Sequence, residues 1–420
     1  MSTMIVYEDA GFANLLPLVY WRAVFDLRLG FDTLLDKVCR ACPHATVQLF
    51  VRDYLADAAA ETHGPIVNLP VVQETLFLNG RLLVGSPFDV PPNTVVQAGD
   101  QVVAVRLDAE RASRMTAEVF LDSQQLSAAL QGLPRQPLEM AEVKLLNYPW
   151  DFVHANAGEL LRQFRTQFGK GGIEGHIYQG AYMLNRDAIH IGPGSKVLPC
   201  VVLDAEQGPI YIGANVKISP HVSVQGPCYI GDDTLIQSGA AIREGTAIGP
   251  VCKVGGEVEA SIIHSYSNKQ HDGFLGHSYL GQWINIAADS ITSDLKNTYG
   301  KVRVPINGIE VDSGEMFVGL TVGDHSKCGI NSSFATGSVV GFSANLFMSA
   351  HIPKFVPSFA WYTDSCREYY DAQRGLDVAR KVMARRKVAM TAAQEKLYLH
   401  VMDLAKRHER VDLAAKSIRE

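Results

Sequence analysis

The sequence predicts an α/β domain, a parallel β-helix of hexapeptide repeats and a helical tail, in that order. Three observations support this fold class. Strand-like and helix-like segments alternate over residues 4–155, which is typical of an α/β domain with a largely parallel sheet. A six-residue unit recurs between Ile191 and Asn345, and recurrence at a short fixed period indicates stacked coils. Residues 364–418 combine mixed charges with apolar residues at helical spacing.

Residues 1–150 are expected to form the α/β domain. Two segments, Phe31–Ala41 and Arg111–Leu130, have the apolar spacing of helices. The apolar runs with the length and composition of strands are Met4–Tyr7, Val47–Val51, Ile66–Leu69, Leu76–Asn79 and Val102–Arg106.

Residues 151–175 are expected to form a linker helix followed by a flexible break. A Pro-Trp-Asp turn leads into a helix from about Asp151 to Phe168, and an acidic residue early in a helix is favoured by the helix dipole. The glycine-rich stretch 169–175 then precedes the repeats.

The β-helix is predicted over residues 176–361. One aliphatic side chain per short face points inward, and neighbouring coils must stack to bury it. The clearest copies are IGPGSK (191–196), IGANVK (212–217), ISPHVS (218–223), IGDDTL (230–235), IREGTA (242–247) and IGPVCK (248–253). Two interruptions are predicted, a short one at 203–209 and a long one at 260–323, after which the repeats resume up to residue 345. Insertions in solenoids often build the binding site.

Residues 362–420 are expected to be a helical tail, with Thr391 as an N-cap. We interpret the tail as a packing cap for the open end of the β-helix, in preference to a separate function.

Composition excludes several classes of function. The 420 residues carry a net charge of −6, so there is no basic footprint for nucleic acid and no polybasic run for a membrane surface. No apolar stretch reaches transmembrane length, and the first residues lack the plan of a signal peptide. The seven cysteines, including a lone Cys39-x-x-Cys42 pair, are typical of reduced thiols rather than of a disulfide or zinc framework. We therefore expect a cytoplasmic protein.

Polar groups that the repeats lack are concentrated in the second interruption, in the string NKQHDGFLGHSYLGQWIN. This segment resembles the acetyltransferase half of the bifunctional bacterial enzymes that make UDP-N-acetylglucosamine from glucosamine-1-phosphate. In that family a His followed after three residues by Leu-Gly precedes an Asn-Ile-Gly-Ala-Gly stretch. His271 with FLGH (274–277) matches the first part, and Asn285-Ile286 matches the start of the second. The resemblance implies a left-handed β-helix and a homotrimer.

The resemblance also implies roles for particular residues. His271 would be the general base that deprotonates the attacking amine, and histidine titrates near neutral pH. Lys253 and Lys269 are candidate phosphate ligands, and Asn285 would orient the sugar or the acetyl group. Phe274 stands where the family usually has a tyrosine near the sugar phosphate. The alternative is that His271 merely caps a loop.

Acetyl-CoA is the co-substrate that the resemblance implies, and Ala287 and Ala288 would lie along it. This chain has Ala287-Ala288-Asp289 where the family has Gly-Ala-Gly. Glycine tolerates positive φ and close ligand approach, whereas alanine and aspartate add bulk and aspartate adds negative charge. The use of acetyl-CoA is therefore a specific point to test.

The N-terminal domain resembles nucleotidyltransferases, which begin with a strand, an LxxGxGTRM loop and a helix. Here residues 14–38 lack the glycine-rich loop but contain Arg22 and Arg28, which are candidates for bidentate phosphate binding. The alternative is that they form ion pairs with acidic neighbours, namely Glu8, Asp26 or Asp32.

A group of bacterial proteins related to sugar nucleotidyltransferases resembles the chain over nearly its whole length. The shared features are the opening around residues 16–30, the Asn-Gly-Arg at 79–81 and the SNK-HDG-LG segment at 267–276.

Nucleotidyl transfer requires Mg²⁺ held by carboxylates beside the phosphates. The resemblance places one such Asp after the strand at LFLNG, where this chain has Asn79, and Asp151 is the candidate for a metal-ligating carboxylate. Asp26 and Asp53 are more simply explained as a helix cap or a surface charge.

The sequence thus predicts a transferase of sugar-nucleotide biosynthesis, a pathway that serves the cell envelope. It would transfer a nucleotidyl group to a sugar-1-phosphate, an acetyl group to an amino-sugar phosphate, or both. Its partners would be a sugar phosphate and a nucleotide or nucleotide sugar. Two alternatives stay open: only one half is active, or the chain is a non-catalytic trimeric scaffold that binds sugar nucleotides.

Overall fold

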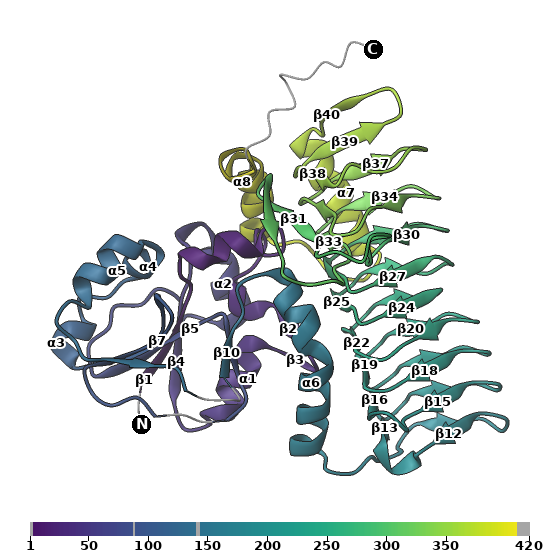
Figure 1. The fold of residues 1–420 in the computed structure, drawn as a ribbon, viewed down its shortest axis with the longest axis horizontal. Helices are drawn as coiled ribbons and strands as arrows, with labels where there is room; N and C mark the ends of the chain where they lie inside the picture. The colour runs from purple at the N-terminus through teal and green to yellow at the C-terminus, as the bar shows by residue number, and fades with distance from the viewer. Residues whose placement is uncertain (1–2, 87–88, 140–142, 410–420) are drawn as a thin grey trace. The chain divides into compact units, whose positions relative to one another are not determined.

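The computed structural model describes residues 3–86, 89–139 and 143–409, and this part of the chain divides into two compact units (Figure 1). Unit 1 consists of the described residues of Met1–Leu15, Trp21–Leu27 and Asp32–Tyr148. Unit 2 consists of the described residues of Leu16–Tyr20, Arg28–Phe31 and Pro149–Glu420. The bounds 1–150 that we expect for the α/β domain stay a prediction; of these residues, 16–20, 28–31 and 149–150 belong to unit 2 and the other described ones fall in unit 1.

Unit 1 is built on a mixed sheet. Its strands follow the order β4 (Thr46–Phe50), β1 (Thr3–Tyr7), β5 (Thr75–Asn79), β8 (Gln101–Leu107), β7 (Thr94–Ala98) and β9 (Arg135–Pro137). β1 runs parallel to β4 and to β5, whereas β8 is antiparallel to β5 and β7. Every residue of β1 is buried, as expected for a central strand covered on both faces.

Two predicted elements of this domain are wrong in detail. Ile66–Leu69 forms only an isolated parallel bridge, between Val67 and Leu49, and not a strand. Asn68 ends the pairing, because its φ is 51° and its side chain bonds both backbone groups of Val51. The predicted helix Arg111–Leu130 is broken into α3 (Ala109–Ala112), α4 (Ala117–Leu121) and α5 (Ser123–Ala129). Asp122 restarts the helix because its carboxylate accepts the amides of Gln124 and Gln125.

The other elements of unit 1 surround this sheet. Helix α1 begins with a capping box between Thr33 and Asp36. The aromatic rings of Tyr7 and Phe120 stack with centroids 3.9 Å apart, so the strands and the helices α3 to α5 share one core. The remaining bounds are β3 (Asp32–Thr33), α1 (Leu34–Ala41), α2 (Ala56–His63), β6 (Leu82–Val84) and β10 (Val143–Leu145).

Unit 2 contains α6 (Pro149–Gln167), β2 (Arg28–Leu29) and a solenoid whose strands begin at His176 and end at Tyr369. Ile191, Ile212, Ile230 and Ile248 open successive repeats, lie in register and are fully buried. Burying such a side chain contributes about 1.5–3 kcal/mol, so the stacked isoleucines stabilise the coils. The predicted β-helix of hexapeptide repeats is confirmed.

Within the described residues, the solenoid strands form three main sheets. The first is β11 (His176–Ile177), β14 (Lys196–Val197), β17 (Lys217–Ile218), β20 (Leu235–Ile236), β23 (Lys253–Val254), β26 (Asn268–Lys269), β29 (Asn285–Ile286), β34 (Lys327–Cys328), β37 (Asn345–Phe347), β39 (Ala360–Thr363) and β40 (Arg367–Tyr369). The second is β12 (Tyr182–Leu184), β15 (Val202–Asp204), β18 (Ser223–Gln225), β21 (Ala241–Ile242), β24 (Glu257–Glu259) and β27 (Phe274–Gly276). The third is β13 (Ile189–Ile191), β16 (Ile210–Ile212), β19 (Cys228–Ile230), β22 (Thr246–Ile248), β25 (Ile262–Ser265), β28 (Tyr279–Gln282), β33 (Thr321–Val322), β36 (Val339–Val340) and β38 (Phe355–Val356).

The long predicted interruption is shorter in the structure. Strands β25 to β29 continue the sheets without loss of register. The chain leaves the solenoid only after β30 (Ile291–Thr292) and returns to it at β33. In between it forms the hairpin of β31 (Arg303–Ile306) and β32 (Ile309–Asp312). β30 itself pairs with β35 (Ser333–Phe334). Lys269 explains the error, because it occupies an inward position in register with Val254 and Ile286. The short insertion at 203–209 lies between β15 and β16, as predicted.

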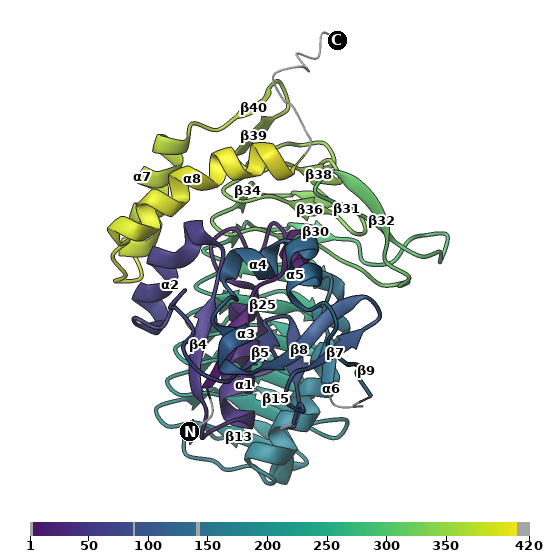
Figure 2. The same cartoon turned by 90° about the vertical axis from the view of Figure 1, so that its left-hand side faces the viewer.

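The tail is helical from α7 (Ala372–Ala384) to α8 (Ala392–His408), and Thr391 is the N-cap that we predicted. Figure 2 shows both helices beside the last coils of the solenoid. The ring of Tyr398 on α8 contacts those of Phe342 and Phe359, so the tail packs on these coils. Residues 410–418, which we also expected to be helical, lie outside the described part of the chain. No helix among the described residues is both long and apolar enough to cross a membrane.

Candidate functional site

Unit 1 contains a cavity of about 410 Å³. Asp9 follows the carboxyl end of β1, Arg81 follows that of β5, and Gln101 begins β8. Phe120 and Leu126 from α4 and α5 provide an apolar wall. Small-molecule sites in α/β sheets lie at the carboxyl ends of parallel strands. The cavity is therefore the candidate binding site of unit 1.

Arg81 organises the polar side of this cavity. Its guanidinium is almost fully buried and forms a bidentate ion pair with Asp9, at 2.8 Å from Nε to Oδ1 and 2.5 Å from Nη2 to Oδ2. Nη2 also donates to Gln101 Oε1 at 2.9 Å. A Cβ on Gly11 would clash with Arg81 Cζ, so this close approach requires glycine at that position. The Asp9–Arg81 pair is electrically neutral and rigidly held.

Asn79 belongs to the same network. Its Nδ2 donates to Asp9 Oδ2 at 2.8 Å, and its Oδ1 accepts the amide of Arg81 at 3.0 Å. The oxygens that a cation would need are thus already bonded to donors. No cluster of three or more His, Cys, Asp or Glu side chains suited to a metal occurs in the described residues. Asp151 lies in the first turn of α6, in unit 2. The residues around Asn79 do not fit a Mg²⁺ ion.

The structure assigns the two predicted phosphate-binding arginines to different units. Arg22 is buried in unit 1, where its backbone carbonyl accepts Arg52 Nη2 at 2.9 Å. Arg28 belongs to unit 2, where its backbone amide and carbonyl both bond the hydroxyl of Tyr279 at 2.9 Å. The Arg28 guanidinium donates to the carbonyl of Phe31 and lies 5.8 Å from the ring centroid of Tyr229.

Each acidic residue that we considered as a partner of these arginines bonds at least one other side chain. Glu8 forms a buried bidentate pair with Arg52, at 3.0 Å from Nε to Oε2 and 2.9 Å from Nη2 to Oε1. Asp26 bonds His63 at 3.0 Å, and Asp32 bonds Arg40 at 2.7 Å.

In unit 2, His271 lies in the exposed turn between β26 and β27. Within the described residues its imidazole forms no hydrogen bond or ion pair, whereas its carbonyl accepts Lys269 Nζ at 2.8 Å. The ring nitrogens of His271 are therefore available to a ligand, and the loop is held by the lysine rather than by the ring.

Lys269 is a buried lysine in the wall of the solenoid. Its ammonium group also donates to the carbonyl of Gly255 at 3.0 Å, which ties two neighbouring coils together. Burial lowers the pKa of Lys269 to about 8, and the carboxylates of Asp272 and Asp289 oppose this shift. These contacts favour a structural role for Lys269 rather than the role of phosphate ligand that we predicted.

Replacing Lys269 by methionine is expected to remove one source of pH-dependent stability. Because the pKa of Lys269 is about 8 in the folded protein and 10.5 for a lysine in water, the unfolded chain binds more protons between these values. This lysine therefore makes the free energy of unfolding rise with pH through that window, by on the order of 3 kcal/mol. Denaturant unfolding of wild type and Lys269→Met should give curves of stability against pH that diverge there.

The exposed Lys170 provides the matched control, since Lys170→Met should leave the pH profile unchanged. Parallel profiles for wild type and Lys269→Met would show that Lys269 keeps an ordinary pKa.

The other predicted residues of unit 2 lie on neighbouring coils. Lys253 and Asn285 occupy one outward column, two coils apart, with Asn268 between them. Phe274 is half-buried on β27, in register with Glu257. Ala287 and Ala288 lie half-buried at the next corner. Asp289 follows them, exposed and with φ of 57°, which is the backbone conformation that glycine adopts at lowest cost.

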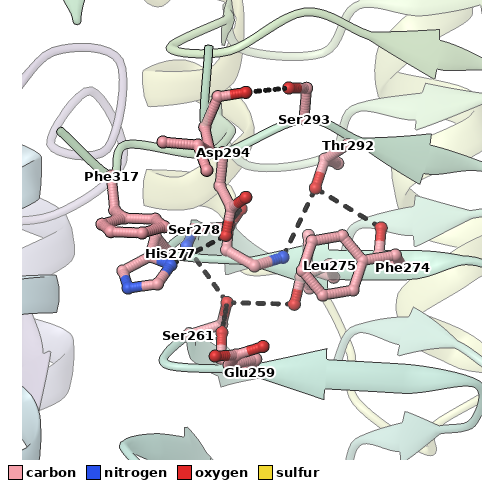
Figure 3. Close-up of polar contacts among 12 residues, drawn as sticks. Glu259, Ser261, Phe274, Leu275, His277, Ser278, Thr292, Ser293, Asp294 and Phe317 are labelled. Carbon is pink, nitrogen blue, oxygen red and sulfur yellow. Dashed lines mark hydrogen bonds and ion pairs between the residues drawn. The ribbon is translucent and has the colours of Figure 1, made fainter. Parts of the chain in front are cut away.

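Sequence reasoning missed a histidine–aspartate pair near the base of the hairpin (Figure 3). His277 Nδ1 lies 2.8 Å from Asp294 Oδ2, and the imidazole stacks on the ring of Phe317 with centroids 5.0 Å apart. The backbone amide of His277 donates to the carbonyl of Glu259 at 3.1 Å. Burial raises the pKa of the Glu259 carboxyl, while His277 opposes this shift. Because Nδ1 is paired with Asp294, Nε2 is the ring nitrogen that His277 could use as a base. A carboxylate that holds one ring nitrogen in this way orients the imidazole.

Comparison with protein families gives two matches within the chain. Residues 4–168 match the family described as sugar nucleotidyl transferase. Residues 209–244 match the family described as bacterial transferase hexapeptide. The resemblance of the two parts to a sugar nucleotidyltransferase and a hexapeptide transferase is therefore confirmed, and the cavity of unit 1 lies within the first matched segment.

Curated relatives that are named as bifunctional proteins match part of the chain. The chain is 28% identical over 240 residues to the bifunctional protein GlmU of Heliobacterium modesticaldum, which covers 56% of this chain and 48% of that protein. It is 26% identical over 160 residues to a bifunctional sugar-1-phosphate nucleotidylyltransferase/acetyltransferase of Sulfurisphaera tokodaii, which covers 33% of this chain and 40% of that protein. The chain thus spans between a third and a half of the length of these relatives.

Among solved structures, the chain is similar to UDP-N-acetylglucosamine O-acyltransferase from Moraxella catarrhalis, with 12% identity and a TM-score of 0.23 over 56% of this chain and 97% of that one. It is also similar to the N-acyltransferase AntD from Bacillus cereus, with 11% identity and a TM-score of 0.19 over 50% of this chain and 89% of that one.

Proposed function

We propose that this chain is a transferase of sugar-nucleotide metabolism. Unit 1 would bind a nucleotide or nucleotide sugar, and the solenoid would transfer an acetyl group to an amino-sugar phosphate. The observation that most supports this proposal is the polar cavity of unit 1, which lies at the carboxyl ends of β1 and β5 within the segment that matches sugar nucleotidyl transferases. The active form would be a homotrimer, as the resemblance of the solenoid implies.

The proposed acyl transfer needs a base at the solenoid. The amine of the acceptor attacks the thioester carbonyl of acetyl-CoA, its proton passes to an imidazole, and coenzyme A leaves as the thiol after taking a proton. His271 is the proposed base because its ring has no other partner in the described residues. His277, oriented by Asp294, is the alternative base. Ala287 and Ala288 would line the path of the coenzyme.

A second candidate function for unit 1 is binding without nucleotidyl transfer. The observation that favours it is the Asp9–Arg81 pair, together with the bonding of Asn79, because these residues leave no carboxylate arrangement suited to Mg²⁺. In this case the cavity would hold a nucleotide sugar as a ligand, and only the solenoid would be catalytic.

Two assays of the purified chain test the proposal. The first supplies glucosamine-1-phosphate and acetyl-CoA and follows release of the free thiol. The second supplies a sugar-1-phosphate, a nucleoside triphosphate and Mg²⁺ and follows pyrophosphate. Thiol release alone would support the second candidate for unit 1, and both products would support transfer in both units. If neither product forms over several sugar phosphates, nucleotides and acyl donors, the proposed transferase is rejected.

Arg135 is the residue through which ligand binding in unit 1 can be tested. Of the arginines that line the cavity in the described residues, Arg81 pairs with Asp9, whereas Arg135 donates to the neutral Gln97 at 3.0 Å. A phosphate in the cavity would therefore gain a charge-assisted bond from Arg135. Arg135→Gln is expected to weaken the binding of UDP-N-acetylglucosamine about tenfold, measured by calorimetry.

Arg114 provides the control, because it is an exposed arginine of unit 1 that pairs with Glu110 away from the cavity. If wild type and Arg135→Gln bind UDP-N-acetylglucosamine with equal affinity, Arg135 does not contact the ligand.

A further inference from the structure

An outward column of polar residues crosses the coils that surround His271. Lys253 on β23 is in register with Asn268 on β26, Asn268 with Asn285 on β29, and Asn285 with Lys327 on β34. Neighbouring coils of a parallel sheet are about 4.8 Å apart, so these side chains form a continuous strip. Asn268 also lies only three residues before His271 in the same coil. The strip and the proposed base therefore share one part of the solenoid.

The helical tail adds cations to this strip. Arg386, just after α7, donates from Nη2 to Asn268 Oδ1 at 2.6 Å. Arg385 is the C-cap residue of α7 and lies beside it. The hydrogen bond takes the acceptor oxygen of Asn268, so the Nδ2 group of this amide remains as a donor. Lys253, Asn268 and Arg386 thus all present N–H donors at one place.

These cations have no carboxylate partner in the described residues. Lys253, Arg385, Arg386 and Lys327 form no ion pair there, and Lys327 donates to the carbonyl of His325 at 2.6 Å. Burial lowers the pKa of Lys253, and the guanidinium groups of Arg386 and Arg385 lower it further. The carboxyl end of α7 offers only about half a negative charge. Like charges held close together without compensation are a source of repulsion that a bound anion would remove.

We propose that Lys253, Asn268 and Arg386 form a binding site for a phosphate group. Two cations flanking an amide donor match the charge and the acceptor oxygens of a phosphate or diphosphate. Asn268 and His271 are at most about 11 Å apart between Cα atoms, since a chain extends by no more than about 3.6 Å per residue. A ligand whose phosphate lies at Asn268 can therefore reach His271 with its other end. The site gives the tail a role in binding in addition to packing.

The identity of the ligand rests on the proposed acetyl transfer, whereas the site itself does not. The phosphate would come either from the amino-sugar phosphate or from the diphosphate of coenzyme A. The probes are inorganic diphosphate for the site itself, and glucosamine-1-phosphate and ADP for its two sources, all measured by calorimetry at low salt on the full chain.

Wild type is expected to bind diphosphate, and Arg386→Gln and Lys253→Gln should each weaken this binding at least about tenfold. Lys381→Gln is the matched control, because Lys381 is an exposed lysine of α7 outside the strip, and the affinity of this variant for diphosphate should match that of wild type. The ligand-free Arg386→Gln variant should unfold at a temperature equal to or above that of wild type, because a repulsive charge has been removed. A merely structural Arg386 would give a lower temperature.

If glucosamine-1-phosphate competes with diphosphate for the site, the sugar phosphate is the ligand. If ADP competes with diphosphate, the ligand is the coenzyme. If Arg386→Gln unfolds at a lower temperature than wild type, the diphosphate affinity of Lys253→Gln alone tests the site. Absence of diphosphate binding by wild type, or unchanged binding by Lys253→Gln, would overturn the site. Neither result bears on the acetyl-transfer assay, so the site and the proposed reaction can fail independently.

Discussion

Replacement of Arg52 by methionine is expected to lower the free energy of unfolding by about 3–5 kcal/mol, because it leaves a buried carboxylate without its countercharge. Glu8 and Arg52 are almost fully buried. Glu8 Oε1 also accepts the amide of Val24 at 2.9 Å, and Oε2 accepts that of Arg52 at 3.0 Å, so the carboxylate cannot turn towards solvent without losing these bonds. Methionine keeps the unbranched stem of the arginine side chain but removes the guanidinium group, whose Cζ lies 4.3 Å from the ring centroid of Phe12. Denaturant unfolding of the full chain measures the loss.

Two variants identify the cause of this loss. Adding Glu8→Gln to Arg52→Met should restore part of the stability, because the unpaired charge is then gone. Arg114→Met breaks an exposed pair with Glu110 and should change the free energy of unfolding by less than about 1 kcal/mol. A loss below about 1 kcal/mol for Arg52→Met itself would show that Glu8 is neutral or solvated in the folded chain.

The substitution His271→Ala is expected to lower the rate of acetyl transfer by about 10²–10⁴-fold, with little change in stability. The imidazole is exposed and forms no bond in the described residues, so its removal leaves no buried group unsatisfied. The loss should appear in kcat, because the base acts in the chemical step rather than in binding. Added imidazole should restore part of the rate by entering the vacated position.

His351→Ala serves as the control, since His351 is another exposed histidine of the solenoid. If His271→Ala keeps full activity while His277→Ala and Asp294→Asn lose it, the base is His277 and the assignment from the family resemblance is wrong. Retention of activity by all of these variants would show that neither histidine is the base.

The solenoid could be predicted from the sequence because each coil is specified by residues that lie close together in the chain. An isoleucine at the start of each repeat must be buried by the next coil, so Ile191, Ile212 and Ile230 reveal both the period and the fold. The same rule misled us at 260–323, where Lys269 replaces the aliphatic residue. A lysine at that position is compatible with the coil only because two carbonyls bind its ammonium group, and the sequence does not show them.

The candidate sites depend on contacts between residues that are distant in the sequence. Arg81 and Asp9 are 72 residues apart, and Arg386 and Asn268 are 118 apart. In the sequence, each of these residues is indistinguishable from an ordinary surface charge or helix cap. The folded structure is needed to show that Arg81 neutralises Asp9 and that Arg386 bonds Asn268 in the polar strip. His277 and Asp294 are closer in sequence, at 17 residues, but their pairing follows from a single coil of the solenoid that we had assigned to the interruption.

The last strand pair of the solenoid has a consequence for solubility. β39 is parallel to β37, whereas β40 folds back antiparallel against β39 and so reverses the direction of the chain. A stack of parallel coils presents unpaired backbone groups at its final edge, and a second molecule could extend it there in the same way that amyloid fibrils grow. β40 has only three residues and carries the exposed charged side chains of Arg367 and Glu368, and short, charged edge strands disfavour such pairing.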